Sequence, residues 1–423
     1  MELISRTLRA NFTSAKALGA SLAAISIIAF ALLPCGCSQS HSRPPGPAAT
    51  PIVRVLIVEN KPRAELSATE PPAVRVGSET PQRIGLSGGA SATITLSAAG
   101  WRLGDVLFPA GVLSVEPASE GSVSIDGHAY RGKFRFVPKA GGKFDVVNDV
   151  DVEGYLMGVI AKELFWNWHP EAYRAQAIAA RTYALYESRT RSESAAFDLF
   201  ADTRSQVYGG IAAESAKSRE AVEATHGMVV AFGPQGKERI FKAYFSSCCG
   251  GVTQSAAAAF AEPASEPLSA QQTSCCTQSP HYAWAPVSIS KNEITRRLRI
   301  WGANVNAPEK TIGEVARIDI LTTNRFGRPE SFAVTDVRGL RYRLGSEDLR
   351  IGIDTDAGDG PKLPSSYCKP VNEPGIVRFT EGHGLGHGVG LCQWCAQEQA
   401  VAGESYSQIV LKAYPGAVIV AAY

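Results

Sequence analysis

The hydrophobic pattern of the chain changes at residues 152–164, which read VEGYLMGVIAKEL. Residues at helical spacing form one stripe there: Leu156, Val159, Ile160 and Glu163. The following segment, 171–191, repeats alanines and aromatic residues over the length of a long helix, and Pro170 suits its first turn. The sequence therefore predicts two consecutive helices after residue 151.

The region before these helices has a different period. Residues 52–150 contain short alternating apolar and polar runs, such as 53–58, 92–96 and 133–137, separated by Gly and Pro. This alternation is typical of β-strands, and a second strand-rich subdomain is expected at about 311–353. We therefore expect an α+β fold with a β-rich N-terminal part at 52–150 and a second domain at 151–423.

Composition limits the class of protein. The 423 residues are 45% hydrophobic and 19% charged, which is typical of a folded globular chain. The formal net charge of +2 arises at the N-terminus, where Arg6, Arg9 and Lys16 face only Glu2, so the remainder is close to neutral. A dominant role in binding polyanions is therefore excluded, and no nucleic-acid partner is expected.

Residues 1–37 have the features of a targeting segment. A basic stretch precedes the apolar run 20–33, which is too short for a comfortable membrane span. Cys37 after the small Gly36 resembles a bacterial lipoprotein processing site, with an ordinary cleaved signal or an uncleaved anchor as alternatives. Residues 38–51 are rich in Pro and predict a tether. We expect a lipid-anchored protein of the cell envelope, outside the cytoplasm.

Glu163 is the candidate catalytic residue. Its carboxyl shares a helix face with residues that should point to the interior, and Phe165, Trp166 and Trp168 are candidate neighbours. Desolvation raises the pKa of a carboxyl, which can then act as a general acid near neutral pH. The alternative is that Glu163 ends the helix at the surface or forms an ion pair, with Arg174 or Arg181 as partner.

A series of blocks in this chain resembles the SpoIID/LytB family. They run in the family's order: 148–163 (NDVDVEGYLMGVIAKE), 171–183 (EAYRAQAIAARTY), 206–210 (QVYGG), 221–227 (AVEATHG), 243–253 (AYFSSCCGGVT) and 382–394 (GHGLGHGVGLCQW). The resemblance spans about residue 53 to the C-terminus, and it implies that 151–423 is a SpoIID-like catalytic domain.

The resemblance implies a peptidoglycan lytic transglycosylase without a required cofactor. Such enzymes cleave the bond between N-acetylmuramic acid and N-acetylglucosamine in glycan strands stripped of peptides, and leave 1,6-anhydromuramoyl ends. Glu163 matches the family's catalytic glutamate. The main alternative, from the LytB side, is a non-catalytic peptidoglycan-binding enhancer of a cell-wall amidase; a weaker one is an amide hydrolase with a Cys/His metal centre. Sporulation, division and wall turnover stay open as the process.

Further matched residues are substrate-binding candidates: Gln176, Arg181, Tyr244, His383, His387 and Gln393. The first two would orient the acid or bind a sugar, or else brace the helix packing. Tyr244 suits sugar stacking or an edge of the core. The glycine-rich segment 382–390 predicts a substrate-facing loop carrying both histidines; zinc ligation and a buried tight turn are the alternatives.

The cysteine pattern allows two interpretations, disulfides or a zinc cluster. Ser205 and Phe200 stand where some family members have zinc-binding cysteines, so that metal site should be absent. Outside the cytoplasm disulfides are the default, and two vicinal pairs and a C-x2-C motif can join in several ways: Cys248, Cys249, Cys275, Cys276, Cys392 and Cys395. The same distribution also allows a zinc cluster of four thiolates, the one cofactor considered.

Overall fold

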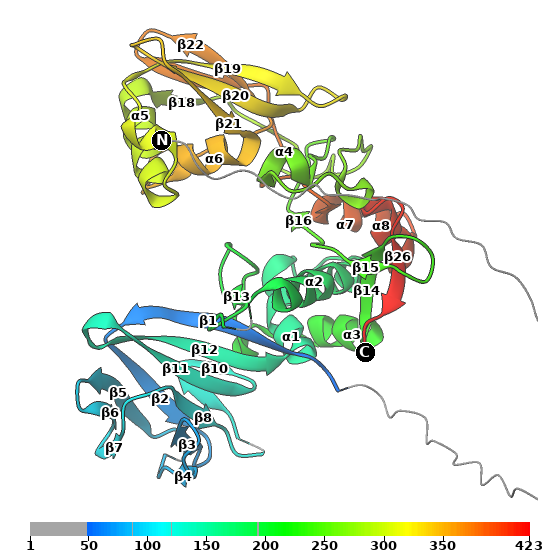
Figure 1. Ribbon diagram of the computed structural model, residues 1–423. Coiled ribbons are helices and arrows are strands. Elements are labelled where there is room, and N and C mark those ends of the chain that lie inside the picture. The colour runs from blue at the N-terminus through cyan, green and yellow to red at the C-terminus, as the bar shows by residue number, and fades with distance from the viewer. Residues whose placement is uncertain (1–48, 87, 120, 193) are drawn as a thin grey trace, which may run out of the picture. The chain divides into compact units, whose positions relative to one another are not determined.

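The computed structural model describes residues 49–86, 88–119, 121–192 and 194–423, which belong to one compact unit with an α+β fold, as predicted (Figure 1). Within these ranges, no helix has both the length and the apolar character that a membrane crossing needs. The predicted signal segment 1–37, with Cys37, and the tether up to residue 48 lie outside the described residues.

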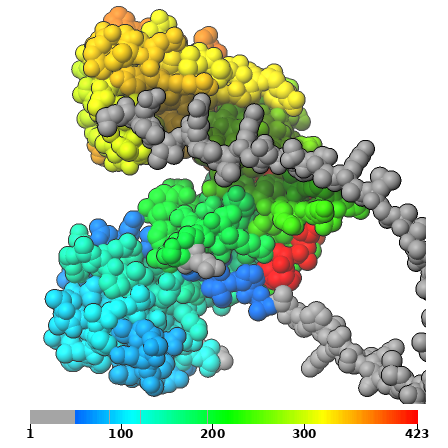
Figure 2. Space-filling model, in the orientation of Figure 1, coloured from blue at the N-terminus to red at the C-terminus, as the bar shows by residue number. Residues whose placement is uncertain are grey.

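Two sheets make up the β-rich N-terminal part. In sheet order, the first contains β13 (Leu199–Phe200), β1 (Ile52–Lys61), β12 (Lys143–Asp151), β11 (Lys133–Lys139), β8 (Leu113–Glu116), β3 (Ala73–Val76) and β4 (Gln82–Arg83). The second contains β10 (His128–Tyr130), β9 (Val123–Ile125), β2 (Arg63–Ala68), β5 (Ser91–Ser97), β6 (Gly100–Leu103) and β7 (Val106–Phe108). In Figure 2 the side chains of these blue and cyan strands close the gaps seen between the ribbons.

An aromatic contact joins the apolar faces of the two sheets. The ring of Trp101 in β6 lies edge-on to Phe144 of β12 and Phe136 of β11, with centroids 5.3 Å and 6.1 Å away. All three side chains are buried. Edge-to-face pairs of this kind add to the stabilisation from burying large apolar surfaces. The apolar positions of the alternating strands therefore form a core between the two sheets.

The two predicted helices follow directly from β12. Helix α1 (Val152–Glu163) begins at Asp151, whose Oδ1 accepts a hydrogen bond from the Gly154 N–H at 2.8 Å. Helix α2 (Pro170–Thr190) has its proline in the first turn, as expected. Both helices lie within one residue of their predicted bounds.

Helix α2 lies at the centre of the helical layer. It contacts α1, α3 (Ala216–Ala224), α7 (Gln393–Val401) and α8 (Tyr406–Ala413). One hydrophobic core includes residues from Val53 in β1 to Ala417 near the C-terminus. The β-rich part and the helices share this core, and a domain boundary at residue 150 stays a prediction.

A second hydrophobic core lies between residues 289 and 379. It is formed by α5 (Lys291–Asn304), α6 (Ser346–Asp354) and two three-stranded sheets, β18 (Val287–Ser290), β23 (Ile376–Thr380) and β22 (Lys369–Glu373), and β19 (Val315–Thr323), β20 (Pro329–Asp336) and β21 (Arg341–Gly345). The latter three strands fall within the predicted strand-rich segment 311–353.

Short elements connect the two cores and complete the fold. They are β14 (Met228–Phe232), β15 (Arg239–Ile240), β26 (Val418–Ala421), β16 (Phe245–Ser246), β25 (Leu391–Cys392), β17 (Ala283–Trp284), β24 (Gly382–His383) and α4 (Ala256–Phe260). Strands β16 and β25 pair in parallel although almost 150 residues separate them in sequence, and this pairing brings the last family block beside the 243–253 block.

A buried ion pair holds the helices together. The guanidinium of Arg181 in α2, which is fully buried, contacts both carboxylate oxygens of Glu153 in α1 at 3.0 Å and 2.7 Å. The same carboxylate accepts from the Gly227 N–H and from the Tyr423 hydroxyl. Burial alone would raise the pKa of Glu153, but these hydrogen bonds, led by Arg181, hold it below its ordinary value. The pair therefore connects α1, α2, the start of β14 and the C-terminus.

We expect Arg181→Met to lower the free energy of unfolding by about 3–5 kcal/mol, because it leaves the Glu153 carboxylate buried without its partner. Urea denaturation measures this loss. The control is Lys61→Met, which removes a more exposed partner of Asp126 and should cost under about 1 kcal/mol. Equal small losses in the two variants would contradict the bracing role of Arg181.

Candidate functional site

Glu163 is the last residue of α1, and its carboxyl is held by two segments distant in sequence. Oε1 accepts a hydrogen bond from the Val207 backbone N–H, and Oε2 accepts one from the Gln393 side-chain amide, both at 3.2 Å. The residue is only partly buried. The carboxyl is thus held by protein groups, while part of the residue stays exposed to solvent.

The electrostatics of Glu163 are those of a carboxyl that favours its protonated form. Burial raises its pKa, and the two hydrogen bonds lower it only in part. Neither donor carries a charge. Arg181 pairs with Glu153, and Arg174 pairs with Glu171 and Glu220, so neither predicted ion-pair partner bonds to Glu163. This direction agrees with the one expected from the sequence, and the catalytic role of Glu163 stays a prediction.

The Val207 N–H belongs to a loop that the side chain of Gln206 holds against α1 and α2. Buried Gln206 accepts from the Tyr155 hydroxyl of α1 at 3.2 Å and donates to the Ala180 carbonyl of α2 at 3.3 Å. A Cβ on Gly158 would lie 2.9 Å from both the Gly210 carbonyl and the Tyr208 ring. Only glycine therefore lets this loop approach α1 so closely. The QVYGG block marked this loop in the sequence, but not its contact with Glu163.

Gln393 begins helix α7 and reaches Glu163 from there. The preceding residue, Cys392, caps the helix and belongs to β25, which pairs with β16. The Trp394 N–H donates to the Ser247 carbonyl at 3.1 Å. These contacts fix the first turn of α7, so Gln393, predicted to bind substrate, is placed as a hydrogen-bond partner of the candidate acid.

An aromatic cluster follows Glu163. The ring of Trp168 lies 5.0 Å from Trp394 and 5.4 Å from Phe165 between centroids. Phe165 is 58% exposed and Trp166 is 84% exposed. The expectation that Trp166 desolvates Glu163 is therefore wrong, because its side chain lies largely in solvent. Exposed rings next to a candidate acid offer apolar surface to a ligand.

Two predicted substrate-binding residues lie inside the helical layer. Gln176 in α2 is fully buried, and its amide atoms have no hydrogen-bond partner among the described residues. The guanidinium of Arg181 donates hydrogen bonds to Glu153 and to the backbone carbonyls of Val222 and Met228. Neither bonds to Glu163. The contacts of Arg181 favour the bracing alternative, and substrate binding by either residue stays a prediction.

Tyr244 and His387 form a packed group. Tyr244 stacks on Phe260 with centroids 4.5 Å apart and donates its hydroxyl to Glu262. His387 lies edge-on to both rings, and its Nδ1 accepts from the Val389 N–H at 3.0 Å. Burial lowers the pKa of His387 to about 4, which keeps the imidazole neutral.

His383 occupies a separate environment. Its Nδ1 lies 3.1 Å from the Tyr282 carbonyl, and its ring packs on Tyr367 and Tyr282.

The glycine-rich segment 382–390 approaches other backbone closely. A Cβ on Gly390 would lie 2.1 Å from the Tyr244 carbonyl, and Gly390 has a φ of +70°. These features favour the buried-turn alternative for 382–390. The close group of metal-ligating side chains in the described residues contains cysteines and neither histidine.

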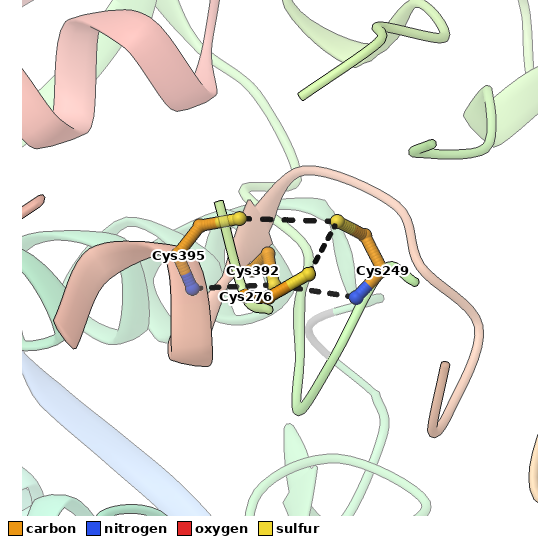
Figure 3. Close-up of side chains that lie close together, drawn as sticks. All are labelled: Cys249, Cys276, Cys392 and Cys395. Atoms are coloured by element: carbon orange, nitrogen blue, oxygen red, sulfur yellow. Dashed lines mark hydrogen bonds between the residues drawn. The ribbon is translucent and has the colours of Figure 1, made fainter. Parts of the chain in front are cut away.

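All six predicted cluster cysteines meet in one place, and Figure 3 shows four of them. Cys275 and Cys395 form a disulfide, which is one of the pairings the sequence left open. The Sγ atoms of four members lie within 4.8 Å of one another: Cys249, Cys276, Cys392 and Cys395. The remaining cysteine among the described residues, Cys368, belongs to the second core.

Known proteins resemble this chain over most of its described length. The model of the SpoIID family, "Stage II sporulation protein", matches residues 140–232, which include Glu163 and the 206–210 loop. An uncharacterized protein of Brachyspira hyodysenteriae (strain ATCC 49526 / WA1) is 30% identical over 297 residues, 70% of this chain and 74% of that protein.

Two Bacillus proteins are also similar. The "Amidase enhancer" of Bacillus subtilis (strain 168) is 24% identical over 330 residues, 70% of this chain but only 44% of that protein. The "Stage II sporulation protein D" of Bacillus amyloliquefaciens is 28% identical over 284 residues, 64% of this chain and 74% of that protein. With the geometry around Glu163, these matches lead to one conclusion: the chain belongs to the SpoIID family.

Proposed function

We propose that this protein is a peptidoglycan lytic transglycosylase that cleaves muramic acid–glucosamine bonds in peptide-stripped glycan strands. The observation that carries the proposal is the Glu163 carboxyl, whose pKa is raised by burial while part of the residue stays exposed to solvent. Family membership and relatives named for sporulation and amidase enhancement support a role at the cell wall.

The proposed chemistry uses one carboxyl twice. Protonated Glu163 donates its proton to the glycosidic oxygen as the bond to C1 of the muramic acid breaks. The carboxylate then takes the proton of the sugar's own 6-hydroxyl, whose oxygen bonds to C1 and forms the 1,6-anhydro ring. Glu163 therefore gives one proton and takes one back, and it ends protonated as it began.

The hydrogen bonds to Glu163 suit this double role. The Val207 N–H and the Gln393 amide stabilise the carboxylate after the first proton transfer, because both donate to its oxygens. Among the described residues, no carboxylate is a hydrogen-bond partner of Glu163 or a cause of its pKa shift. An internal sugar hydroxyl as nucleophile fits a site built on one acid.

The exposed aromatic residues after α1 support a sugar ligand. Phe165 and Trp166 follow Glu163 by two and three residues and present their rings to solvent. The apolar faces of pyranose rings pack well on such surfaces. We therefore propose that these two rings bind the glycan beside the bond that Glu163 protonates.

A non-catalytic role remains the second candidate. The similarity to a protein named amidase enhancer favours it, and the partner would then be a cell-wall amidase. In that case the same surface would bind peptidoglycan without cleavage. The presence of a desolvated glutamate at the matched position favours the enzyme.

The location of the protein is proposed from residues 1–37 alone. We propose that Cys37 is lipidated and holds the chain on the outer face of the cytoplasmic membrane or elsewhere in the envelope. Mass spectrometry of the mature N-terminus tests this, since an acylated Cys37 is expected there and a non-acylated N-terminus would contradict it.

The central test is mass spectrometry of products from peptide-free glycan strands. We expect the protein to release fragments with 1,6-anhydromuramic ends, and Glu163→Gln to lose at least about 100-fold in rate, because it removes the general acid. Glu223→Gln is the control, since Glu223 is an exposed carboxylate, and it should retain the wild-type rate.

Three outcomes would contradict the proposal in distinguishable ways. Cleavage retained by Glu163→Gln would remove Glu163 from the mechanism. Hydrated reducing ends would indicate a hydrolase that uses water as nucleophile. Glycan binding without any cleavage by the wild-type protein would support the enhancer candidate.

The pH profile tests the Gln393 contact. Activity requires protonated Glu163, so kcat/KM should fall as pH rises through the pKa of Glu163. The Gln393 amide lowers that pKa, and Gln393→Leu should therefore move the alkaline limb to higher pH. Gln397→Leu is the control, because Gln397 lies on the same helix and accepts from the His169 N–H instead. An alkaline limb that stays in place or moves to lower pH would contradict the assignment.

A further inference from the structure

The cysteine cluster is the part of the molecule that the proposed function leaves unexplained. Its members come from three segments: the turn after β16 (Cys248 and Cys249), the loop at Cys275 and Cys276, and the start of α7 (Cys392 and Cys395). Figure 3 shows four of them around a common centre. All four are buried, so the sulfur atoms face one another inside the protein.

The spacing of the sulfur atoms matches a single tetrahedral ion. Zinc–thiolate bonds of about 2.3 Å in a tetrahedron place the sulfurs about 3.8 Å apart. The Sγ of Cys249 lies 3.6 Å from that of Cys276 and 3.9 Å from that of Cys395. All pairs that include Cys392 also lie within 4.8 Å. These distances leave room for one ion at the centre.

The surroundings offer hydrogen-bond donors to the sulfur atoms. The backbone N–H groups of Cys249 and Cys395 donate to the Sγ of Cys392 at 3.2 Å and 3.5 Å. Cys392 also caps the N-terminus of α7, where the helix dipole favours negative charge. The Thr273 hydroxyl lies 3.3 Å from the Sγ of Cys249. Such donors are the usual outer contacts of metal-bound thiolates.

A buried cation beside the cluster supplies an independent observation. Arg328 is fully buried, and its guanidinium donates to the carbonyls of Cys249, Val252 and His387 at 3.2 Å, 2.7 Å and 2.9 Å. It forms no ion pair with any described carboxylate, and nearby Glu347 pairs with Arg350. Buried charges need compensation. Four thiolates with one divalent cation carry two net negative charges, which Arg328 would offset in part.

We propose that Cys249, Cys276, Cys392 and Cys395 bind one divalent cation of the zinc class through four thiolates. Because both use the Sγ of Cys395, this metal form and the Cys275–Cys395 disulfide exclude one another. The metal form follows when a thiol or phosphine reductant supplies two electrons, and solvent two protons, to convert the disulfide into two thiols; the four ligand thiols then release their protons to solvent as they bind the ion.

The location of the ion gives it a positioning role. Gln393, the partner of Glu163, lies between two of the proposed ligands, Cys392 and Cys395. The ion would also join α7 to the turn after β16 through Cys249. Metal binding would therefore fix the first turn of α7, from which the Gln393 amide reaches Glu163.

The test is a titration of the full-length protein in detergent with Co²⁺, after reduction by a phosphine. We expect one ion per chain, with the intense absorption of cobalt–thiolate charge transfer and the visible bands of tetrahedral cobalt, and displacement by Zn²⁺. Cys276→Ser and Cys395→Ser should weaken binding at least tenfold. Cys368→Ser is the control for a buried cysteine outside the cluster and should bind as the wild type does.

The variant Cys275→Ser separates this proposal from a purely disulfide-bonded cluster. It frees Cys395, so it should bind Co²⁺ even without reductant, whereas Cys395→Ser should bind at least tenfold more weakly than the reduced wild type under either condition. Equal behaviour of these two variants, or no metal bound by reduced wild-type protein that unfolds cooperatively, would overturn the proposal. Neither readout depends on glycan cleavage, so failure here leaves the role of Glu163 to its own experiment.

Discussion

The site depends on a balance between desolvation and hydrogen bonding at one carboxyl. Burial at the end of α1 raises the pKa of Glu163, and donors located 44 and 230 residues downstream restrain that rise. A fully exposed carboxyl would be ionised at neutral pH, whereas a fully buried one would not meet a substrate. The structure keeps Glu163 between these limits, and much of the fold serves to bring the two donors to it.

Each donor arrives through a specific constraint. The Val207 N–H depends on Gly158, which lets the 206–210 loop lie against α1, and on the buried amide of Gln206. Gln393 depends on the parallel pairing of β16 and β25 and on the start of α7. The Glu153–Arg181 pair holds α1 against α2. Loss of any one would move a donor without touching Glu163 itself.

Local features of this chain were predictable from its sequence. The stripe that contains Glu163 predicted α1, and the alanines and aromatic residues after Pro170 predicted α2, each to within one residue. The apolar face of that stripe also implied the direction of the pKa shift of Glu163. Contacts between distant segments were not predictable, because periodicity carries no information on which loop meets which helix. Trp166 shows the same limit, since its place just beyond a helix end lets it turn into solvent.

Polar residues in the interior were the hardest to interpret. Arg181 and Gln176 lie on a mostly apolar helix, and a sequence does not reveal whether such a residue meets a ligand or a buried partner such as Glu153. The six cysteines pose a similar problem, since their spacing allows 15 disulfide connectivities as well as metal ligation. Only their arrangement around a common centre beside Arg328 favours an ion.

The proposed mechanism requires Glu163 to be protonated at a pH where ordinary carboxyls are ionised. Infrared difference spectroscopy of the wild-type protein against Glu163→Gln, recorded as a pH titration, measures this directly through the carboxyl C=O stretch. We expect the stretch assigned to Glu163 to persist above pH 4.5, the ordinary value for a glutamate. A carboxyl that ionises at or below that pH would contradict the claim that Glu163 is a general acid.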